Sequence, residues 1–132
     1  MLNILFIEDD QIETLKFERI LNVLSRKHKY HNSSNGEQAL TYLKTIKEQP
    51  SLILLDLNMP KMNGLEFLKV LKEDEQLHHI PVVVLTTSNN EADIKEAYRI
   101  GIAGYVTKPL KYEAYKAQLQ IILDYWTINQ LT

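Results

Sequence analysis

Leu52–Pro60 reads LILLDLNMP, and this stretch decides how the chain folds. Its run of apolar residues is typical of a short strand that is covered on both faces. Pro60 then indicates a turn. The carboxylate of Asp56 therefore lies at the carboxyl end of the strand. A charged residue directly after a buried strand suggests a role beyond packing.

The same design recurs elsewhere in the chain. Three more apolar segments run into polar residues, and these are Asn3–Ile7 before Glu8-Asp9-Asp10, Pro81–Leu85 before Thr86-Thr87-Ser88, and Ala103–Thr107 before Lys108-Pro109. Buried strands that alternate with helices predict an α/β fold with a parallel, doubly wound sheet. Ligands bind such sheets at the carboxyl ends of the strands. We therefore expect acids, a hydroxyl and an amine to share one crevice.

Apolar residues at helical spacing predict a helix after each strand. The expected helices run from Asp10 or Gln11 to the basic cluster at Arg26–Lys29, over Glu37–Lys47, over Leu65–Asp74, over Glu91–Ile100 with Gly101 as a left-handed cap, and onward from Lys111. In the first helix, the apolar positions at helical spacing are Ile12, Leu15, Phe17, Ile20, Leu21 and Leu24. The remaining strand, Tyr30–Ser33, is short and polar, which suits a sheet edge.

The last helix carries two apolar stripes. One has the spacing of a core face and consists of Tyr112, Tyr115, Leu119, Ile122 and Trp126. The other consists of Ala114, Ala117, Ile121 and Tyr125. This second stripe either widens the core face or forms a dimer or partner surface, and the sequence leaves both interpretations open.

Composition narrows the class of protein. The chain has 132 residues, which suits one domain. Its 15 basic and 17 acidic residues give a net charge of -2, so we expect neither nucleic acid nor a membrane as a partner. The absence of cysteine excludes disulfides, thiolate zinc sites and a cysteine nucleophile. Leu2–Ile7 is too short for a signal peptide or a membrane span, so a cytoplasmic location is expected.

The order of five strand and helix units, with acids after the first and third strands, Thr86 after the fourth and Lys108-Pro109 after the fifth, resembles the response-regulator receiver family. Asp56–Gly64 is similar to the phosphoacceptor loop of the stand-alone chemotaxis regulator. Ile80–Ser88 and the terminal Tyr125-Trp126 also resemble, more weakly, single-domain regulators paired with bacterial phytochrome kinases. The resemblance implies a flavodoxin-like receiver fold with strand order 2-1-3-4-5 and a cis bond before Pro109.

Three carboxylates that converge on one crevice repel each other, and a hard divalent cation with oxygen ligands relieves the repulsion. The sequence therefore predicts Mg²⁺ as the cofactor. The resemblance implies that Asp9 and Asp56 are direct ligands, that Asn58 contributes its backbone carbonyl, and that Glu8 acts through a water. Asp10, the third acid of its run, has the simpler interpretation of a helix cap.

The resemblance also assigns the reaction. It implies that Asp56 is the phosphoacceptor, that Thr86 and Lys108 contact the phosphoryl group, and that Thr86 and Tyr105 form the switch. The donor is then a phosphohistidine on a sensor histidine kinase or a histidine phosphotransfer protein. We expect a signalling phosphoacceptor rather than an enzyme, with weak self-catalysed phosphorylation and dephosphorylation.

Phosphorylation should act on the surface of the fourth helix, the fifth strand and the fifth helix. Its candidate apolar contacts are Ile94, Tyr98, Ile121 and Tyr125. An unidentified downstream protein, or a second copy in a homodimer, would bind there. Because the chain ends soon after the fifth helix, we expect a single receiver domain over residues 1–132 with no output domain.

Other interpretations compete with a phosphoacceptor site. Taken singly, Asp9 and Asp10 are ordinary helix caps, Asp56 is an ordinary turn residue and Lys108 an ordinary solvated lysine. A haloacid-dehalogenase phosphohydrolase needs a second aspartate two residues after its nucleophile, where this chain has Asn58. The stronger alternative is a pseudo-receiver that binds a partner without phosphorylation. The complete set of acids, threonine and lysine argues against it.

Overall fold

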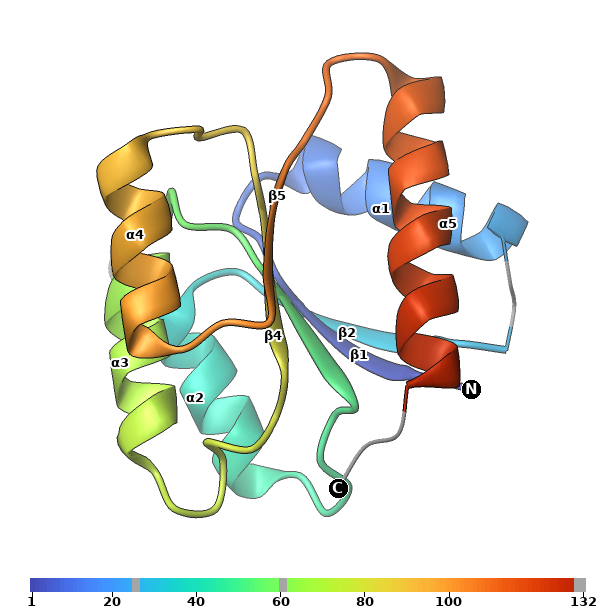
Figure 1. Ribbon diagram of the computed structural model, residues 1–132. Helices are drawn as coiled ribbons and strands as arrows, with labels where there is room; N and C mark the ends of the chain where they lie inside the picture. Colours follow the sequence, from blue (N-terminus) through green and yellow to red (C-terminus); the bar gives the residue numbers. More distant parts are fainter. Residues whose placement is uncertain (25–26, 60–61, 130–132) are drawn as a thin grey trace.

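The computed structural model describes residues 1–24, 27–59 and 62–129. Within them, strands and helices alternate along the chain, five of each (Figure 1). The strands are β1 (Asn3–Ile7), β2 (Lys29–Ser33), β3 (Leu52–Leu55), β4 (Val82–Thr86) and β5 (Gly104–Thr107). The helices are α1 (Gln11–Leu24), α2 (Gly36–Thr45), α3 (Gly64–Glu73), α4 (Glu91–Ile100) and α5 (Tyr112–Ile128).

All strand pairs are parallel, and the strands lie in the order β2-β1-β3-β4-β5. This confirms the predicted doubly wound α/β sheet, and it also confirms that the polar β2 lies at an edge. Parallel pairing brings the carboxyl ends of all strands to one edge of the sheet. The end of β3, which precedes Asp56, therefore lies between the ends of β1 and β4.

Alternate residues of the central strands face two separate cores, one on each side of the sheet. Leu5, Ile53 and Val84 pack with α2, α3 and α4. Ile4, Leu54 and Val83 pack with α1 and α5. Figure 1 shows these two layers of helices on opposite faces of the sheet. Burial on both faces explains why these strands are apolar at consecutive positions.

The helix ends follow local capping chemistry. Before α3, the Asn63 side chain accepts the backbone N–H of Glu66, and the Glu66 side chain accepts that of Asn63. This capping box starts α3 one residue before the predicted Leu65. At the end of α4, Gly101 has a φ of 128°, which confirms the glycine cap. Arg26 of the predicted basic cluster lies outside the described residues.

The helix α1 is confirmed, but two of its apolar residues do not face the core. Ile12 and Leu15 are 67% and 62% exposed, whereas Phe17 is fully buried. The reason is the helical phase, because the core stripe continues one turn back from Phe17 to position 13. That position is Glu13, so the acid faces the sheet side and the two apolar residues face solvent.

The two stripes of α5 have different environments. Tyr115, Leu119 and Trp126 are buried, which confirms the predicted core face. Ile121 and Tyr125 are 68% and 56% exposed, so the second stripe does not widen the core. A surface that can contact a partner remains the interpretation for this stripe.

Two further expectations concern single features of the chain. Lys108–Pro109 is trans, since the described residues contain no cis peptide bond, and the cis bond implied by the family resemblance is wrong here. Pro60 and Lys61, in the loop that resembles a phosphoacceptor loop, lie outside the described residues. In the described ranges, no helix has the length and apolar character needed to cross a bilayer.

Gly64 generates the first prediction, because α3 begins against the loop that carries Asp56. A Cβ at Gly64 would lie 2.6 Å from Leu57 Cα and 2.7 Å from the Asp56 carbonyl oxygen. Backbone atoms cannot move aside cheaply, so Gly64→Ala should lower the free energy of unfolding by about 2 kcal/mol. Thermal unfolding followed by circular dichroism measures the effect.

Gly104→Ala is the matched control. The nearest atom to a Cβ at Gly104 would be a side-chain carbon of Val83, at 4.0 Å, which is an ordinary contact. This variant should melt at the wild-type temperature or slightly above it. Equal melting temperatures for the two variants would show that the close approach at Gly64 does not constrain the loop.

Candidate functional site

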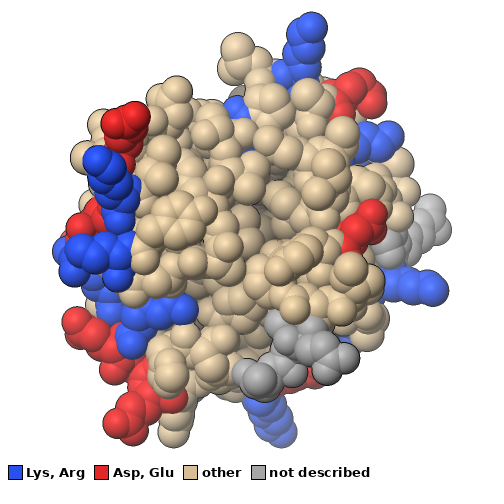
Figure 2. All heavy atoms as spheres, viewed as in Figure 1, with Lys and Arg blue, Asp and Glu red and all other residues tan. Residues whose placement is uncertain are grey.

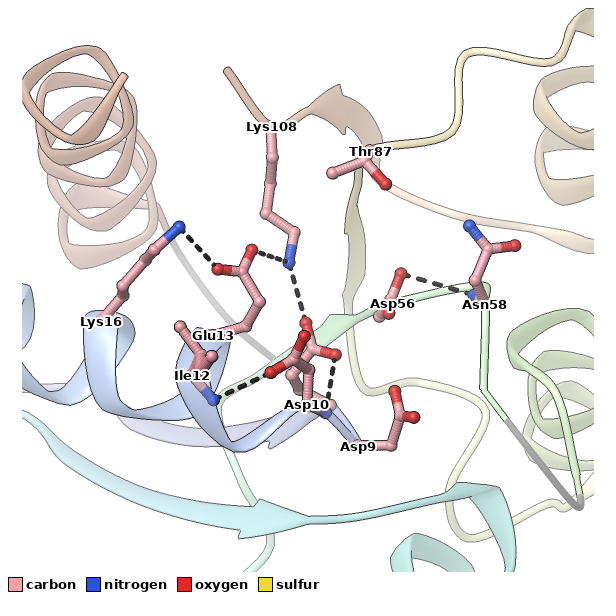
Figure 3. Close-up of a pocket in the computed structure, with 10 residues that line it drawn as sticks. Asp9, Asp10, Ile12, Glu13, Lys16, Asp56, Asn58, Thr87 and Lys108 are labelled. Atoms are coloured by element: carbon pink, nitrogen blue, oxygen red, sulfur yellow. Dashed lines mark hydrogen bonds and ion pairs between the residues drawn. The ribbon is translucent and has the colours of Figure 1, made fainter. Parts of the chain in front are cut away.

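A pocket of about 480 Å³ lies where β1, β3 and β5 end (Figure 3). Its lining residues are Glu8, Asp9, Asp10, Ile12, Glu13, Lys16, Asp56, Asn58, Thr87 and Lys108. The structure thus brings together five of the residues singled out from the sequence for this site, namely Glu8, Asp9, Asp56, Asn58 and Lys108. They reach the pocket because each lies at most three residues beyond the end of a strand of the parallel sheet.

Three carboxylates form the centre of the pocket. One oxygen each of Glu8, Asp9 and Asp56 lies within 4.8 Å of the other two. Glu8 and Asp56 are buried, and Asp9 is exposed. The backbone N–H of Asp56 donates to the Ile7 carbonyl at 3.1 Å, which ties the end of β3 to the end of β1. Sheet pairing therefore fixes the spacing of these acids.

Lys108 is the buried cation of the pocket. Its Nζ lies 2.8 Å from Glu8 Oε1 and 3.2 Å from Glu13 Oε1. Its backbone N–H donates to the Thr86 carbonyl at 2.7 Å, which continues the pairing of β4 with β5. Burial alone would lower the pKa of Lys108, but the hydrogen bond with Glu8 and the nearby negative charges raise it above its ordinary value. Lys108 is therefore a permanent positive charge.

Glu8 responds to the same surroundings in the opposite sense. Burial raises the pKa of Glu8 from 4.5 to about 7, the charge of Asp56 adds to the rise, and the bond from Lys108 opposes it. The cluster without a cation therefore retains a proton near neutral pH. This agrees with the expectation that such converging acids need a counter-ion.

The donor set fits a hard divalent cation. Glu8, Asp9 and Asp56 offer only oxygen atoms, which is the chemistry that Mg²⁺ prefers. Asn58 is exposed at the same pocket, and its backbone N–H lies 3.4 Å from Asp56 Oδ1. The backbone of Asn58 therefore lies next to the carboxylates, where its carbonyl oxygen could serve as a further ligand of the cation.

Thr86 and Tyr105 lie beside the pocket rather than in its wall. Thr86 is fully buried at the end of β4, and the wall residue is its neighbour Thr87. The Tyr105 hydroxyl donates to the Ser88 carbonyl oxygen at 2.8 Å. The Ser88 backbone N–H lies 3.4 Å from Thr86 Oγ1. The segment after β4 thus connects the two residues that the sequence assigned to a switch.

Sequence reasoning missed Glu13 and Lys16, whose side chains form an ion pair at 2.9 Å in the pocket wall. The available signal was an acid in the first turn of a helix that begins at the carboxyl end of a strand. Asp10 was interpreted correctly as a cap. Its Oδ1 accepts the backbone N–H of Ile12 at 2.8 Å.

A second feature is the surface over α4, β5 and α5. Figure 2, which has the same view as Figure 1, shows few charged side chains in the middle of this face, whereas Lys, Arg, Asp and Glu gather along its α3 and α4 side. Tyr98, Ile121 and Tyr125 are exposed there, and Ile94 is partly buried. The residues expected on this surface from the sequence are therefore accessible, Ile94 in part.

The sequence matches one family model over most of its length. The model describes the response regulator receiver domain, and it matches residues 4–120. The response regulator Rcp1 from Synechocystis is 34% identical over 128 residues, which cover 93% of this chain and 87% of Rcp1. The chemotaxis protein CheY-3 from Vibrio cholerae is 32% identical, with 87% and 88% of the two chains covered.

Solved structures show the same fold. The phosphorylated cyanobacterial phytochrome response regulator RcpA superposes with a TM-score of 0.92 at 32% identity, covering 98% of this chain and 97% of RcpA. The Mn²⁺-bound form of Rcp1 superposes with a TM-score of 0.90 at 32% identity, covering 100% and 99%. Both resemblances proposed from the sequence, to the chemotaxis regulator and to phytochrome-associated regulators, are confirmed.

Glu8 generates a prediction about pH. Its pKa is about 7 in the folded protein against an ordinary value of 4.5, so between these values only the unfolded chain loses the proton. The free energy of unfolding therefore falls as pH rises from 4.5 to about 7, because ionisation of Glu8 favours the unfolded chain. Below pH 4.5 Glu8 is protonated in both states and causes no such loss. In the presence of a chelator, wild type should lose more stability across the window than Glu8→Gln does. Melting temperatures measured at several pH values test this.

The exposed Glu75 supplies the control, because Glu75→Gln should follow the wild-type curve. Added Mg²⁺ should reduce the fall in wild type, since a cation stabilises the ionised carboxylate. Parallel curves for wild type and Glu8→Gln under chelation would contradict the raised pKa of Glu8.

Proposed function

The chain belongs to the response regulator receiver domain family, and on that premise we propose that Asp56 is its phosphoacceptor. Receiver domains act in two-component signalling, where they interact with histidine kinases, phosphotransfer proteins and downstream targets. They are signalling phosphoacceptors rather than true enzymes. The observation that carries the proposal is the meeting of Asp56 with Glu8, Asp9 and Lys108 in one pocket.

In the proposed reaction, a carboxylate oxygen of Asp56 forms a bond to phosphorus while the bond from phosphorus to the histidine nitrogen of the donor breaks. The donor nitrogen keeps the electron pair, and Asp56 becomes an acyl phosphate. Transfer of this kind depends on positioning and on neutralisation of charge. A fixed carboxylate at the end of β3 beside the buried amine of Lys108 supplies both, so no general base is needed.

Glu8, Asp9 and Asp56, with the backbone carbonyl of Asn58, are the residues that would hold Mg²⁺. When bound, Mg²⁺ neutralises the carboxylates and polarises phosphoryl oxygens. Glu8 would act through a water, in agreement with its own bond to Lys108. The Mn²⁺-bound form of Rcp1 supports a divalent cation in a close structural relative.

The output side of the proposal follows from the new charge. Phosphorylation adds about -1.5 to -2 charge and three acceptor oxygens at Asp56. Lys108 and the Thr86 hydroxyl can bond to those oxygens if the segment after β5 and the end of β4 move toward them. Because Tyr105 holds the segment after β4 through Ser88, this movement would change the surface over α4, β5 and α5.

The proposed phosphoryl donor is a sensor histidine kinase or a histidine phosphotransfer protein. The surface over α4, β5 and α5 would then bind a downstream protein or a second copy of the chain, with Tyr98, Ile121 and Tyr125 as exposed contacts. The phosphorylated structure of RcpA supports phosphorylation in a relative with the same fold. A binding module that acts without phosphorylation needs no buried acids beside a buried lysine, so this alternative is disfavoured.

Acetyl phosphate provides the direct test. Wild type incubated with acetyl phosphate and Mg²⁺ should gain the mass of one phosphoryl group, and Asp56→Asn should gain none, because the amide is not a nucleophile of this kind. Intact-mass spectrometry detects the adduct. A chelator should abolish it.

Asp10→Asn is the matched control, because it removes one acid from the wall of the same pocket but not from the carboxylate cluster. It should form the adduct as wild type does. If Asp56→Asn also forms the adduct, or if wild type forms none while it is folded and saturated with Mg²⁺, the assignment of Asp56 is wrong.

Metal binding gives an independent prediction. Asp9→Asn removes one of the carboxylates of the cluster, so it should weaken Mg²⁺ binding by about tenfold or more. Isothermal titration calorimetry measures the dissociation constant. Asp10→Asn should leave it within about twofold of wild type, since exposed charges nearby are screened by salt. Equal losses in the two variants would mean that only net charge attracts the ion.

A further inference from the structure

Glu13 lies outside the set of strand-end residues, yet it contacts the buried lysine of the pocket. One oxygen of its carboxylate lies 3.2 Å from Lys108 Nζ, and the other lies 2.9 Å from Lys16 Nζ (Figure 3). The Glu13 side chain is 18% exposed and that of Lys108 only 4%. Position 13 is the first core-facing position of α1, one turn before Phe17, so the helical phase fixes this contact.

Lys108 therefore forms ion pairs with two carboxylates, Glu8 after β1 and Glu13 in α1. In the part of the chain that the structure describes, its ion pairs are with Glu8 and Glu13, and none is with Asp56. An amine that serves a phosphoryl group on Asp56 must do so against these two negative charges. The charge on Glu13 also repels the incoming phosphoryl oxygens.

Tyr115 is the nearby group with an unmet requirement. It lies on the core face of α5 and is 3% exposed. Its hydroxyl has no hydrogen-bond partner among the described residues, although a buried donor normally has one. Tyr115 packs in the core between α1 and α5 together with Phe17, which lies one helical turn after Glu13. Burial first, and then the charges of Glu13, Glu8 and Asp56, raise the pKa of Tyr115.

We propose that Glu13 is a positioning residue that restrains Lys108 until Asp56 is phosphorylated, and that its carboxylate then accepts a hydrogen bond from the Tyr115 hydroxyl. This inference rests on the proposed function of Asp56. The lysine has three N–H donors, so it can turn one to a phosphoryl oxygen while it keeps its bond to Glu8. Glu13 is the partner to release, because its bond is the longer of the two.

The exchange would couple the pocket to α5. Before phosphorylation, Glu13 joins the first turn of α1 to the residue after β5. After it, the same carboxylate would join α1 to α5 through Tyr115, inside the core shared by these helices. The buried hydroxyl would then gain its missing acceptor, which favours the phosphorylated arrangement.

Phosphorylation rates test the restraint. At saturating Mg²⁺, Glu13→Gln should form the acetyl phosphate adduct about fivefold faster than wild type, the upper end for a partly exposed ion pair. Glutamine keeps the shape and one acceptor, so the variant isolates the charge. Glu13→Asp keeps the charge and should retain the slow rate. Glu37→Gln is the control, since Glu37 is an exposed acid in the first turn of another helix.

Tyr115 needs a readout that does not depend on turnover. Beryllofluoride, a stable mimic of the phosphoryl group, can be added with Mg²⁺ to protein that carries ¹³C-labelled tyrosine. The ring-carbon NMR signal of Tyr115, assigned with Tyr115→Phe, should shift on addition in wild type as the hydroxyl gains an acceptor. In Glu13→Ala, which has no acceptor at this position, this shift should be reduced or lost. Tyr115→Phe should bind beryllofluoride about threefold more weakly than wild type, the effect of one lost hydrogen bond.

The outcomes separate the two proposals. If wild type forms no adduct, the proposed function fails and this inference fails with it. If wild type forms an adduct on Asp56 but Glu13→Gln reacts at the wild-type rate, only the restraint by Glu13 is overturned. If the Tyr115 signal shifts equally in wild type and Glu13→Ala, the hydrogen bond between the two residues is overturned. Thermal unfolding of each variant verifies that it is folded.

Discussion

The buried ion pair between Lys108 and Glu8 is the interaction on which the rest of the site depends. The two side chains are 4% and 2% exposed, and their residues are 100 positions apart in the chain. Charges at this depth are stable only when paired, because a single buried charge is costly. β1 and β5 are separated in the sheet by β3 and β4. Lys108 therefore extends across the strand ends, and its amine meets the carboxylate cluster that includes Asp56.

Burial and attraction between opposite charges have opposite effects on the pKa of each partner, and the outcome of this competition differs between Lys108 and Glu8. For Lys108, attraction to Glu8 and Glu13 exceeds the penalty of burial, and its pKa is raised. For Glu8, burial and the neighbouring Asp56 exceed the attraction of the single lysine, and its pKa is also raised. One amine thus cannot neutralise the converging acids. This deficit of positive charge is the physical basis for affinity toward a divalent cation.

The fold and the cluster were predictable because both depend on short-range patterns. Consecutive apolar residues indicated each buried strand, and a parallel sheet places the polar residues after its strands at one edge. Glu13 was not predictable in this way, because it lies within α1 rather than directly after a strand, so its contact with Lys108 depends on the phase of the helix. The exposure of Ile12 and Leu15 has a related cause. Apolar spacing does not fix the phase of a helix, which depends on packing against the sheet.

The strand that precedes the lysine, β5, is one of the two edge strands of the sheet. Among the described strands, β5 pairs with β4 alone, and its residues are partly buried or exposed, whereas β3 is fully buried. Displacing β5 therefore disrupts fewer contacts than displacing a central strand. Lys108 comes directly after β5, and Tyr105 within β5 is bonded to Ser88. Any change in the partners of Lys108 thus acts first on the segment that connects the pocket to the weakly charged face over α4 and α5.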